Sequence, residues 1–298
     1  MATRKVWYAL SAVLIIISVV SLFTRGLNLG VDFTGGVTVQ STFPEAANRD
    51  AVSAALQRSG YPNAQVTIFG TARDLSIRLP PTKDSTEVVR GRIEQILRTV
   101  DPGVQIQQVE VIGPQVGGEL KSSARDALIA TLVLIFGYIA LRFHTWKLSV
   151  GAILAVLHDP ILVLGVFSLA QTSFDLTVVA AMLAVIGYSL NDTVVVFDRI
   201  RERFHVSRRV APIVVLDQSI NQTLSRTIMT KVVTLIVVVA LYALGGPVLK
   251  GFSLALIIGI VAGTYSSIYI SSAAALDCGL TAEDLLPAQT RKPVDNMP

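Results

Sequence analysis

Six long apolar segments decide what this sequence can fold into. They lie at about Val6–Phe23, Ala127–Leu141, Leu148–Leu169, Thr177–Phe197, Ile228–Leu244 and Phe252–Ala275. At about 1.5 Å per residue, each is long enough, or nearly so, to cross a hydrocarbon core ~30 Å thick. Hydrophobic residues make up 52% of the chain and charged residues only 15%, which excludes an ordinary soluble protein. The sequence predicts a polytopic α-helical membrane protein with six transmembrane helices.

Basic residues are concentrated in alternate connections between these segments. Arg4 and Lys5 precede the first segment, Arg142 and Lys147 join the second to the third, and an arginine-rich stretch joins the fourth to the fifth. Because short cytoplasmic loops collect Lys and Arg, both termini are predicted to be cytoplasmic and the long polar insert to lie outside. The same bias accounts for the pI of 9.3, so no nucleic-acid partner is predicted.

The segments divide the chain into four predicted parts. These are a cytoplasmic N-terminus with the first helix (1–24), an external, periplasmic-side domain with linkers (25–125), helices two to six with a basic cytoplasmic loop at 198–222 (126–275), and a cytoplasmic tail (276–298). The first segment ends without an Ala-x-Ala cleavage site and is predicted to be a retained anchor. The basic loop is expected either to lie on the anionic leaflet or to contact a partner.

The insert has the composition of a small soluble domain. Strand-like and helix-like patterns follow one another in the β-α-β-β-α-β order of a ferredoxin-like domain, over Gly36–Phe43, Asn48–Ser59, Ala64–Phe69, Leu75–Leu79, Ser85–Val100 and Val104–Ile112. It contains no His and no Cys, and so no Ser-His-Asp or metal-ligand arrangement. The pairs Gly35-Gly36 and Gly117-Gly118 flank the domain. They are predicted either as turns and close-packing points or as hinges that let the domain tilt.

Two polar residues, Asn191 and Asp192, interrupt the fourth apolar segment. Asp192 and Arg226 are equally far in sequence from Arg209, so an antiparallel hairpin would hold them at similar depth. A carboxylate and a guanidinium that face each other in a low-dielectric bundle favour the charged forms of both. A proton on Asp192 would end that pairing while Arg226 stays charged, which predicts a proton switch. The alternatives are a static buried ion pair, or an Arg226 that reaches the lipid headgroups.

A second polar group, His158-Asp159-Pro160, interrupts the third segment. Asp159 lies twelve residues beyond Lys147, which places it ~18 Å into the membrane and near the midplane. Pro160 removes a backbone donor and loosens the helix there. Asp159 is therefore either a second proton carrier or a structural hydrogen-bonding group, and His158 either a helix–helix contact or a relay.

The remaining polar residues give no sign of an enzyme. The three histidines, His144, His158 and His205, form no ligand pair at helical spacing, and Cys278 is the single cysteine, so neither a metal site nor an intramembrane hydrolase is predicted. In the sixth segment Gly259, Gly263 and several serines form a small-residue face. That face suits close packing inside the bundle or against another subunit.

Six short motifs together resemble the SecF family, the accessory subunits of the Sec protein translocase within the resistance-nodulation-division superfamily. They are GVDFTGG at 30–36, GPQVG at 113–117, His158-Asp159, GYSLNDTVVVFDRIRE at 187–202, QTLSRT at 222–227 and GGPVLKGFSL at 245–254. One such motif is weak, because the superfamily shares fragments of them. All six in the right order and topology are specific.

The resemblance implies a protein of the inner or plasma membrane that is not an enzyme and has no cofactor, with protons as its coupling ion. It implies that the chain pairs with SecD and uses the proton-motive force to help preproteins leave the SecYEG channel. By their place in the motifs, Asp192 and Arg226 fall on the family's proton-pathway residues.

The sequence departs from the family pattern at Lys231, where a small polar residue such as Ser is usual. A second cation there either alters the protonation of Asp192 or requires another acid, or it only reaches a headgroup. Two further functions stay open. One is a half-transporter of the same superfamily that exports small molecules or lipids, although such exporters ordinarily carry two six-helix halves in one chain. The other is a purely structural translocase subunit, which is opposed only by the cost of burying Asp192 and Arg226.

Overall fold

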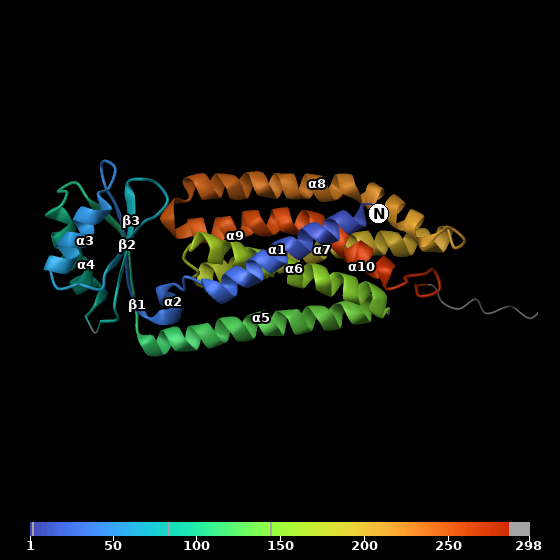
Figure 1. The fold of residues 1–298 in the computed structure, drawn as a ribbon, viewed down its shortest axis with the longest axis horizontal. Helices are drawn as coiled ribbons and strands as arrows, with labels where there is room; N and C mark the ends of the chain where they lie inside the picture. Colours follow the sequence, from blue (N-terminus) through green and yellow to red (C-terminus); the bar gives the residue numbers. More distant parts are fainter. Residues whose placement is uncertain (2, 83, 144, 286–298) are drawn as a thin grey trace, which may run out of the picture.

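The computed structural model describes residues 1, 3–82, 84–143 and 145–285. A long helical bundle carries a small α/β domain at one end (Figure 1). Within the described residues, six helical spans are long and apolar enough to cross a membrane, as predicted. They are α1 (Arg4–Thr24), α5 (Pro114–Phe143), α6 (Trp146–Ala170), α7 (Leu176–Val206), α8 (Pro212–Leu244) and α9 (Gly246–Tyr265), which continues through a π-helical turn, η1 (Ser266–Ile270), into α10 (Ser271–Asp277).

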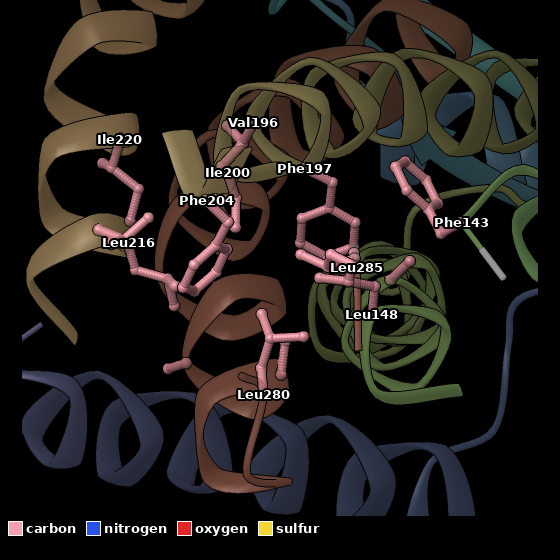
Figure 2. Close-up of a cluster of buried hydrophobic side chains, with 14 of the residues drawn as sticks. Phe143, Leu148, Val196, Phe197, Ile200, Phe204, Leu216, Ile220, Leu280 and Leu285 are labelled. Atoms are coloured by element: carbon pink, nitrogen blue, oxygen red, sulfur yellow. The ribbon is translucent and has the colours of Figure 1, made fainter. Parts of the chain in front are cut away.

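The basic loop predicted at 198–222 is wrong, because α7 and α8 extend through most of it. Only residues 207–211 connect the two helices. In Figure 2, Phe204 of α7 lies beside Leu216 of α8, within an apolar cluster at the end of the bundle opposite the domain. The same cluster includes Leu280 and Leu285, which follow α10. Burying a side chain of this size stabilises by ~1.5–3 kcal/mol, so the two helices stay folded beyond their apolar spans.

The small domain has the predicted element order. Its elements are β1 (Gly36–Thr42), α3 (Arg49–Arg58), β2 (Gln65–Ile68), β3 (Asp74–Leu79), α4 (Thr86–Arg98) and β4 (Gln105–Ile112). The sheet is antiparallel throughout, with the strand order β2-β3-β1-β4. Apolar residues of α3 and α4, such as Leu56 and Ile93, form a core with Val39 and Ile77 of the sheet. The opposite face of the sheet is polar.

A short helix that the sequence did not predict, α2 (Val31–Thr34), joins α1 to this domain. The glycine pairs on either side of the domain differ in their structure. Gly35 and Gly36 have φ values of 69° and 129°, which only glycine adopts readily. Gly117 lies inside α5 rather than in a turn, and a Cβ there would approach the backbone nitrogen of Gly35 to 2.8 Å. The predicted close packing is therefore correct for Gly117, whereas a turn at Gly117-Gly118 is wrong.

Small residues let the spans approach one another closely inside the bundle. A Cβ on Gly259 of α9 would overlap Val185 of α7, and a Cβ on Gly151 of α6 would overlap the carbonyl oxygen of Ser271. The small-residue face of the sixth segment thus packs internally.

Candidate functional site

The buried carboxylate Asp192 forms an ion pair with Lys231. Asp192 lies on α7 and Lys231 on α8, and their side chains are 2.9 Å apart at the closest oxygen and nitrogen. Both residues are buried, with 6% and 4% of their surfaces exposed. The approach does not have hydrogen-bond geometry at Asp192 Oδ2, so the contact is mainly electrostatic. A buried pair of opposite charges is costly to separate, because either charge alone loses both water and its partner.

Aromatic and hydroxyl groups hold Lys231 in this position. Its ammonium lies 5.0 Å from the ring centroid of Tyr188, one turn before Asp192 on α7, which is a cation–π contact. The Tyr188 hydroxyl hydrogen-bonds to Thr234 of α8. These contacts tie α7 to α8 at the level of the ion pair.

The predicted pairing of Asp192 with Arg226 is wrong. Arg226 is exposed and forms no ion pair among the described residues. The buried face of α8 repeats every four residues through Ser219, Thr223, Thr227 and Lys231, and Arg226 lies about 100° around the helix from Thr227. Helical side chains lean toward the N-terminus, so Lys231 reaches back to the level of Asp192. The suggestion that Lys231 only reaches a headgroup is also wrong.

The second predicted group forms a hydrogen-bonded chain in the middle of α6. His158 Nδ1 and Asp159 Oδ1 are 2.9 Å apart, and His158 Nε2 is 2.7 Å from the Tyr265 hydroxyl of α9. Ser11 of α1 donates to that hydroxyl at 3.5 Å. His158 and Asp159 are 2% and 0% exposed. The helix continues through Pro160, which leaves the carbonyl of Val156 without its usual donor.

The other candidates lie apart from these two groups. Asn191 is exposed on α7, and His205 is exposed near its end. His144 lies outside the described residues. Within the part of the chain that the structure describes, no cluster of three His, Cys, Asp or Glu residues could hold a metal ion.

A third polar site, which sequence analysis did not predict, lies where the domain meets the bundle. The chain after α1 forms a β-bridge to the α6–α7 connection, in which Gly30 N donates to Phe174 O at 2.7 Å and Phe174 N donates to Asn28 O at 2.8 Å. Asp32 accepts from the first backbone nitrogen of α7, Leu176, at 2.8 Å. We call this region, with the facing polar side of the sheet, the junction. It lines a partly open pocket of about 340 Å³.

Charged side chains of the junction are partly buried. Arg78 of β3 donates to Asn28 at 2.7 Å, to the carbonyl of Leu29 at 3.2 Å and to Ser173. Burial lowers the pKa of Arg78, and the Asp175 carboxylate opposes that shift. Burial raises the pKa of Glu110, and the negative charges of Asp32 and Asp175 raise it further. Only the GVDFTGG stretch, in which Asp32 is the single charge, marks this region in the sequence.

Comparison with known proteins identifies the family. Residues 92–281 match the family described as Protein export membrane protein SecD/SecF, C-terminal, and residues 20–40 match the SecD/SecF GG motif. The protein translocase subunit SecF of Haemophilus influenzae is 45% identical over 299 residues, which cover 100% of this chain and 91% of the relative. This chain belongs to the SecF family. The SecF of Pseudomonas aeruginosa is 44% identical, and the match covers 100% of this chain and 97% of that relative.

Two solved SecDF structures have the same fold as this SecF-family chain. The translocon-associated membrane protein SecDF from Thermus thermophilus matches with a TM-score of 0.83 and 35% identity over 93% of this chain. SecDF in a super-membrane-facing form matches with a TM-score of 0.67 and 36% identity. In each case this chain corresponds to 38% of the SecDF chain. The GG motif, residues 20–40, includes α2 and the start of the junction, so the part of the chain that marks the family joins the first span to the domain.

Proposed function

We propose that this chain pairs with SecD and uses the proton-motive force to assist the movement of preproteins from the SecYEG channel. In this proposal the chain is a multi-pass protein of the inner or plasma membrane, with its termini in the cytoplasm and its small domain outside. The proposal requires no cofactor, and the proton is the coupling ion. The observation that carries it is the buried Asp192–Lys231 ion pair between α7 and α8.

Protonation changes what this ion pair can do. When a proton binds the Asp192 carboxylate, the electrostatic attraction to Lys231 is lost, and the ammonium is left in a low-dielectric site without a counter-charge. Movement of Lys231 toward water then becomes favourable. So does loss of its own proton, which a lysine can give up and an arginine cannot. Either event removes the electrostatic attraction that helps to hold α8 against α7.

Movement of α7 can reach the external domain through the junction. Asp192 lies sixteen residues along α7 from Leu176, a distance of ~24 Å in a helix. The backbone nitrogen of Leu176 is held by Asp32, and the preceding Phe174 is paired with Asn28 and Gly30. A shift of α7 along its axis therefore pulls on the segment that leads into β1. The two SecDF structures match this chain with different TM-scores, 0.83 and 0.67. This difference supports the proposal that the parts of a SecDF protein change their relative arrangement.

In this proposal Arg226 contacts a group outside this chain rather than Asp192. Its side chain is exposed on α8 in the isolated chain, away from Asp192. An arginine at membrane depth requires a partner or water. We expect a carboxylate of SecD, or the lipid headgroups, to supply that partner.

The experiment is proton flux and preprotein secretion in membrane vesicles that contain the chain with SecD. Asp192→Asn is expected to abolish proton-dependent secretion and proton flux while the complex still co-purifies. The matched control is Asp198→Asn, which removes a carboxylate of α7 that pairs with Arg142 at the surface. Retention of both activities in Asp192→Asn would mean that the ion pair is structural and that Asp192 does not couple protons to secretion.

A further inference from the structure

The oxygens of Asp159 are in two different environments. Oδ1 faces His158 Nδ1 at 2.9 Å, whereas Oδ2 is buried and accepts no hydrogen bond within the described residues. The hydroxyl of Ser189 on α7 is also buried without a partner, and Ser189 is 1% exposed. Both atoms flank the same point, since a Cβ added to Gly263 would lie 3.1 Å from Asp159 Oδ2 and 3.4 Å from Ser189 Oγ. Two unsatisfied polar atoms thus lie around the same point, beside a residue that has no side chain.

Ser189 connects this point to the Asp192–Lys231 pair. Ser189 and Asp192 are three residues apart on α7 and both are buried, so they lie on the same face of the helix. Gly263 of α9 lies beside both Asp159 and Ser189, and Tyr265 of α9 contacts His158. Buried polar residues therefore follow one another across the bundle, from Lys231 through Asp192 and Ser189 to Asp159, although no hydrogen bond joins Ser189 to either aspartate within the described residues.

On the far side of Asp159 the hydrogen bonds have a consistent direction. The Asp159 carboxylate can only accept, so His158 Nδ1 carries the N–H; in the neutral imidazole Nε2 then accepts from the Tyr265 hydroxyl, which in turn accepts from Ser11. The titratable groups that contact Asp159 are therefore His158 and, through it, Tyr265. The helix changes to a π-helical turn directly after Tyr265. Such turns are frequent at functional sites, because they redirect the side chains of the preceding turn.

We propose that Asp159 is a second proton-binding group on the route that serves Asp192. This inference rests on the proposed function and adds a residue, a path and a direction to it. The proton binds Asp159 at Oδ2, because Oδ1 already accepts from His158. It leaves from the same oxygen toward Ser189, either to the hydroxyl directly, whose own proton passes on to the Asp192 carboxylate, or through one bridging water that carries it to that carboxylate. No electron moves, and no covalent bond other than O–H forms or breaks.

Proton flux in vesicles that contain the complex with SecD tests this route. Asp159→Asn keeps the shape of the side chain but cannot carry a proton, and is expected to lower the flux by ~100-fold. Gly263→Ala keeps every polar group but places a methyl 3.1 Å from Asp159 Oδ2 and 3.4 Å from Ser189 Oγ, and is expected to lower the flux several-fold. The matched control is Gly187→Ala on α7, where an added Cβ would meet no atom within 4 Å. Ser189→Ala is a third variant that removes only the hydroxyl.

The pH profile of the flux separates a proton carrier from a merely structural group. Asp159→Glu is expected to restore flux with a shifted pH profile, because the acid is retained at a different position. Normal flux in Asp159→Asn, Gly263→Ala and Ser189→Ala together with no flux in Asp192→Asn would overturn this inference and leave the proposed function intact. Normal flux in Asp192→Asn would instead overturn the proposed function.

Discussion

At the scale of single residues, depth and helix face decide which charges meet. Depth in the hairpin was predictable from the sequence, and it correctly gave Asp192 a basic partner on the following helix. Equal distance from the connection predicts the depth of Arg226 but not the face of α8 on which it lies. The four-residue spacing of Ser219, Thr223 and Thr227 continues to Lys231, and these residues form the buried face of α8. That spacing was the signal in the sequence that identifies Lys231.

Removing one member of the buried pair is expected to destabilise the chain. Lys231→Met leaves the Asp192 charge without a partner and should lower the free energy of unfolding by ~3–5 kcal/mol. Asp192→Asn combined with Lys231→Met should recover much of that loss. Arg226→Gln, at an exposed site, should change the stability by less than ~1 kcal/mol. Unfolding of the detergent-solubilised protein measures these three variants and Asp192→Asn alone. Simple additivity of Asp192→Asn and Lys231→Met in the double variant would contradict a direct interaction.

At the scale of helices and strands, local patterns predicted most elements but not their contacts. The six spans, the strands and the two helices of the domain all follow from periodicity in short windows. The helical ends of α7 and α8 were missed, because an apolar cluster formed with residues after α10 stabilises them. The bridge between Leu29 and Phe174 joins residues far apart in the sequence, and no local pattern encodes such a contact.

Close helix packing predicts a clear difference between two glycines. A Cβ on Gly151 of α6 would overlap the backbone of Ser271, whereas a Cβ on Gly137 of α5 would meet no atom within 4 Å. Gly151→Ala should therefore destabilise the bundle by ~1–3 kcal/mol. Gly137→Ala should leave its stability unchanged or raise it by up to ~1 kcal/mol, because alanine favours a helix. Thermal unfolding in the same detergent measures both, and equal stability of the two variants would contradict the packing of α6 against α10.

The junction is expected to depend on pH through Glu110. Burial raises the pKa of Glu110 above its ordinary value of ~4.3. The folded junction thus holds this proton more tightly than the unfolded chain, so the stabilisation is complete below pH ~4.3 and is lost as the pH rises through the folded pKa. Glu110→Gln should weaken this pH dependence. It should also slow the hydrogen exchange of the junction amides at neutral pH.

Hydrogen exchange measures that effect at the backbone amides of Gly30 and Phe174, which form the bridge. Glu119→Gln, at an exposed position of α5, serves as the control. An unchanged pH dependence of protection in Glu110→Gln would show that Glu110 does not govern the junction.

At the scale of the whole molecule, the bundle buries some spans and exposes others. In α5 and α8 only 11% and 17% of the most apolar window is buried inside the chain. The outer faces of these two helices are thus available to lipid or to SecD. The domain lies at one end of the bundle and the α7–α8 connection at the other (Figure 1). The proposed function requires these two ends to lie on opposite sides of the membrane.

Cysteine labelling tests that orientation directly. In a Cys278→Ser background, Gln57→Cys on α3 should react with a membrane-impermeant maleimide from outside the cytoplasmic membrane. Arg208→Cys, in the connection between α7 and α8, should react only after that membrane is permeabilised. Both positions are exposed in the structure. The reverse pattern would place the domain in the cytoplasm and contradict the proposed topology.

The central claim is that a proton on Asp192 releases α8 from α7, and the distance between these helices tests it most directly. Spin labels at Ala180→Cys and Ala240→Cys, both exposed, report this distance in the complex with SecD when Cys278 is replaced. The account predicts that the distance changes as the pH falls, and that Asp192→Asn shows the low-pH distance at every pH. If the unmutated pair shows one distance throughout, or if Asp192→Asn keeps the full pH dependence, then the Asp192–Lys231 pair does not act as the switch.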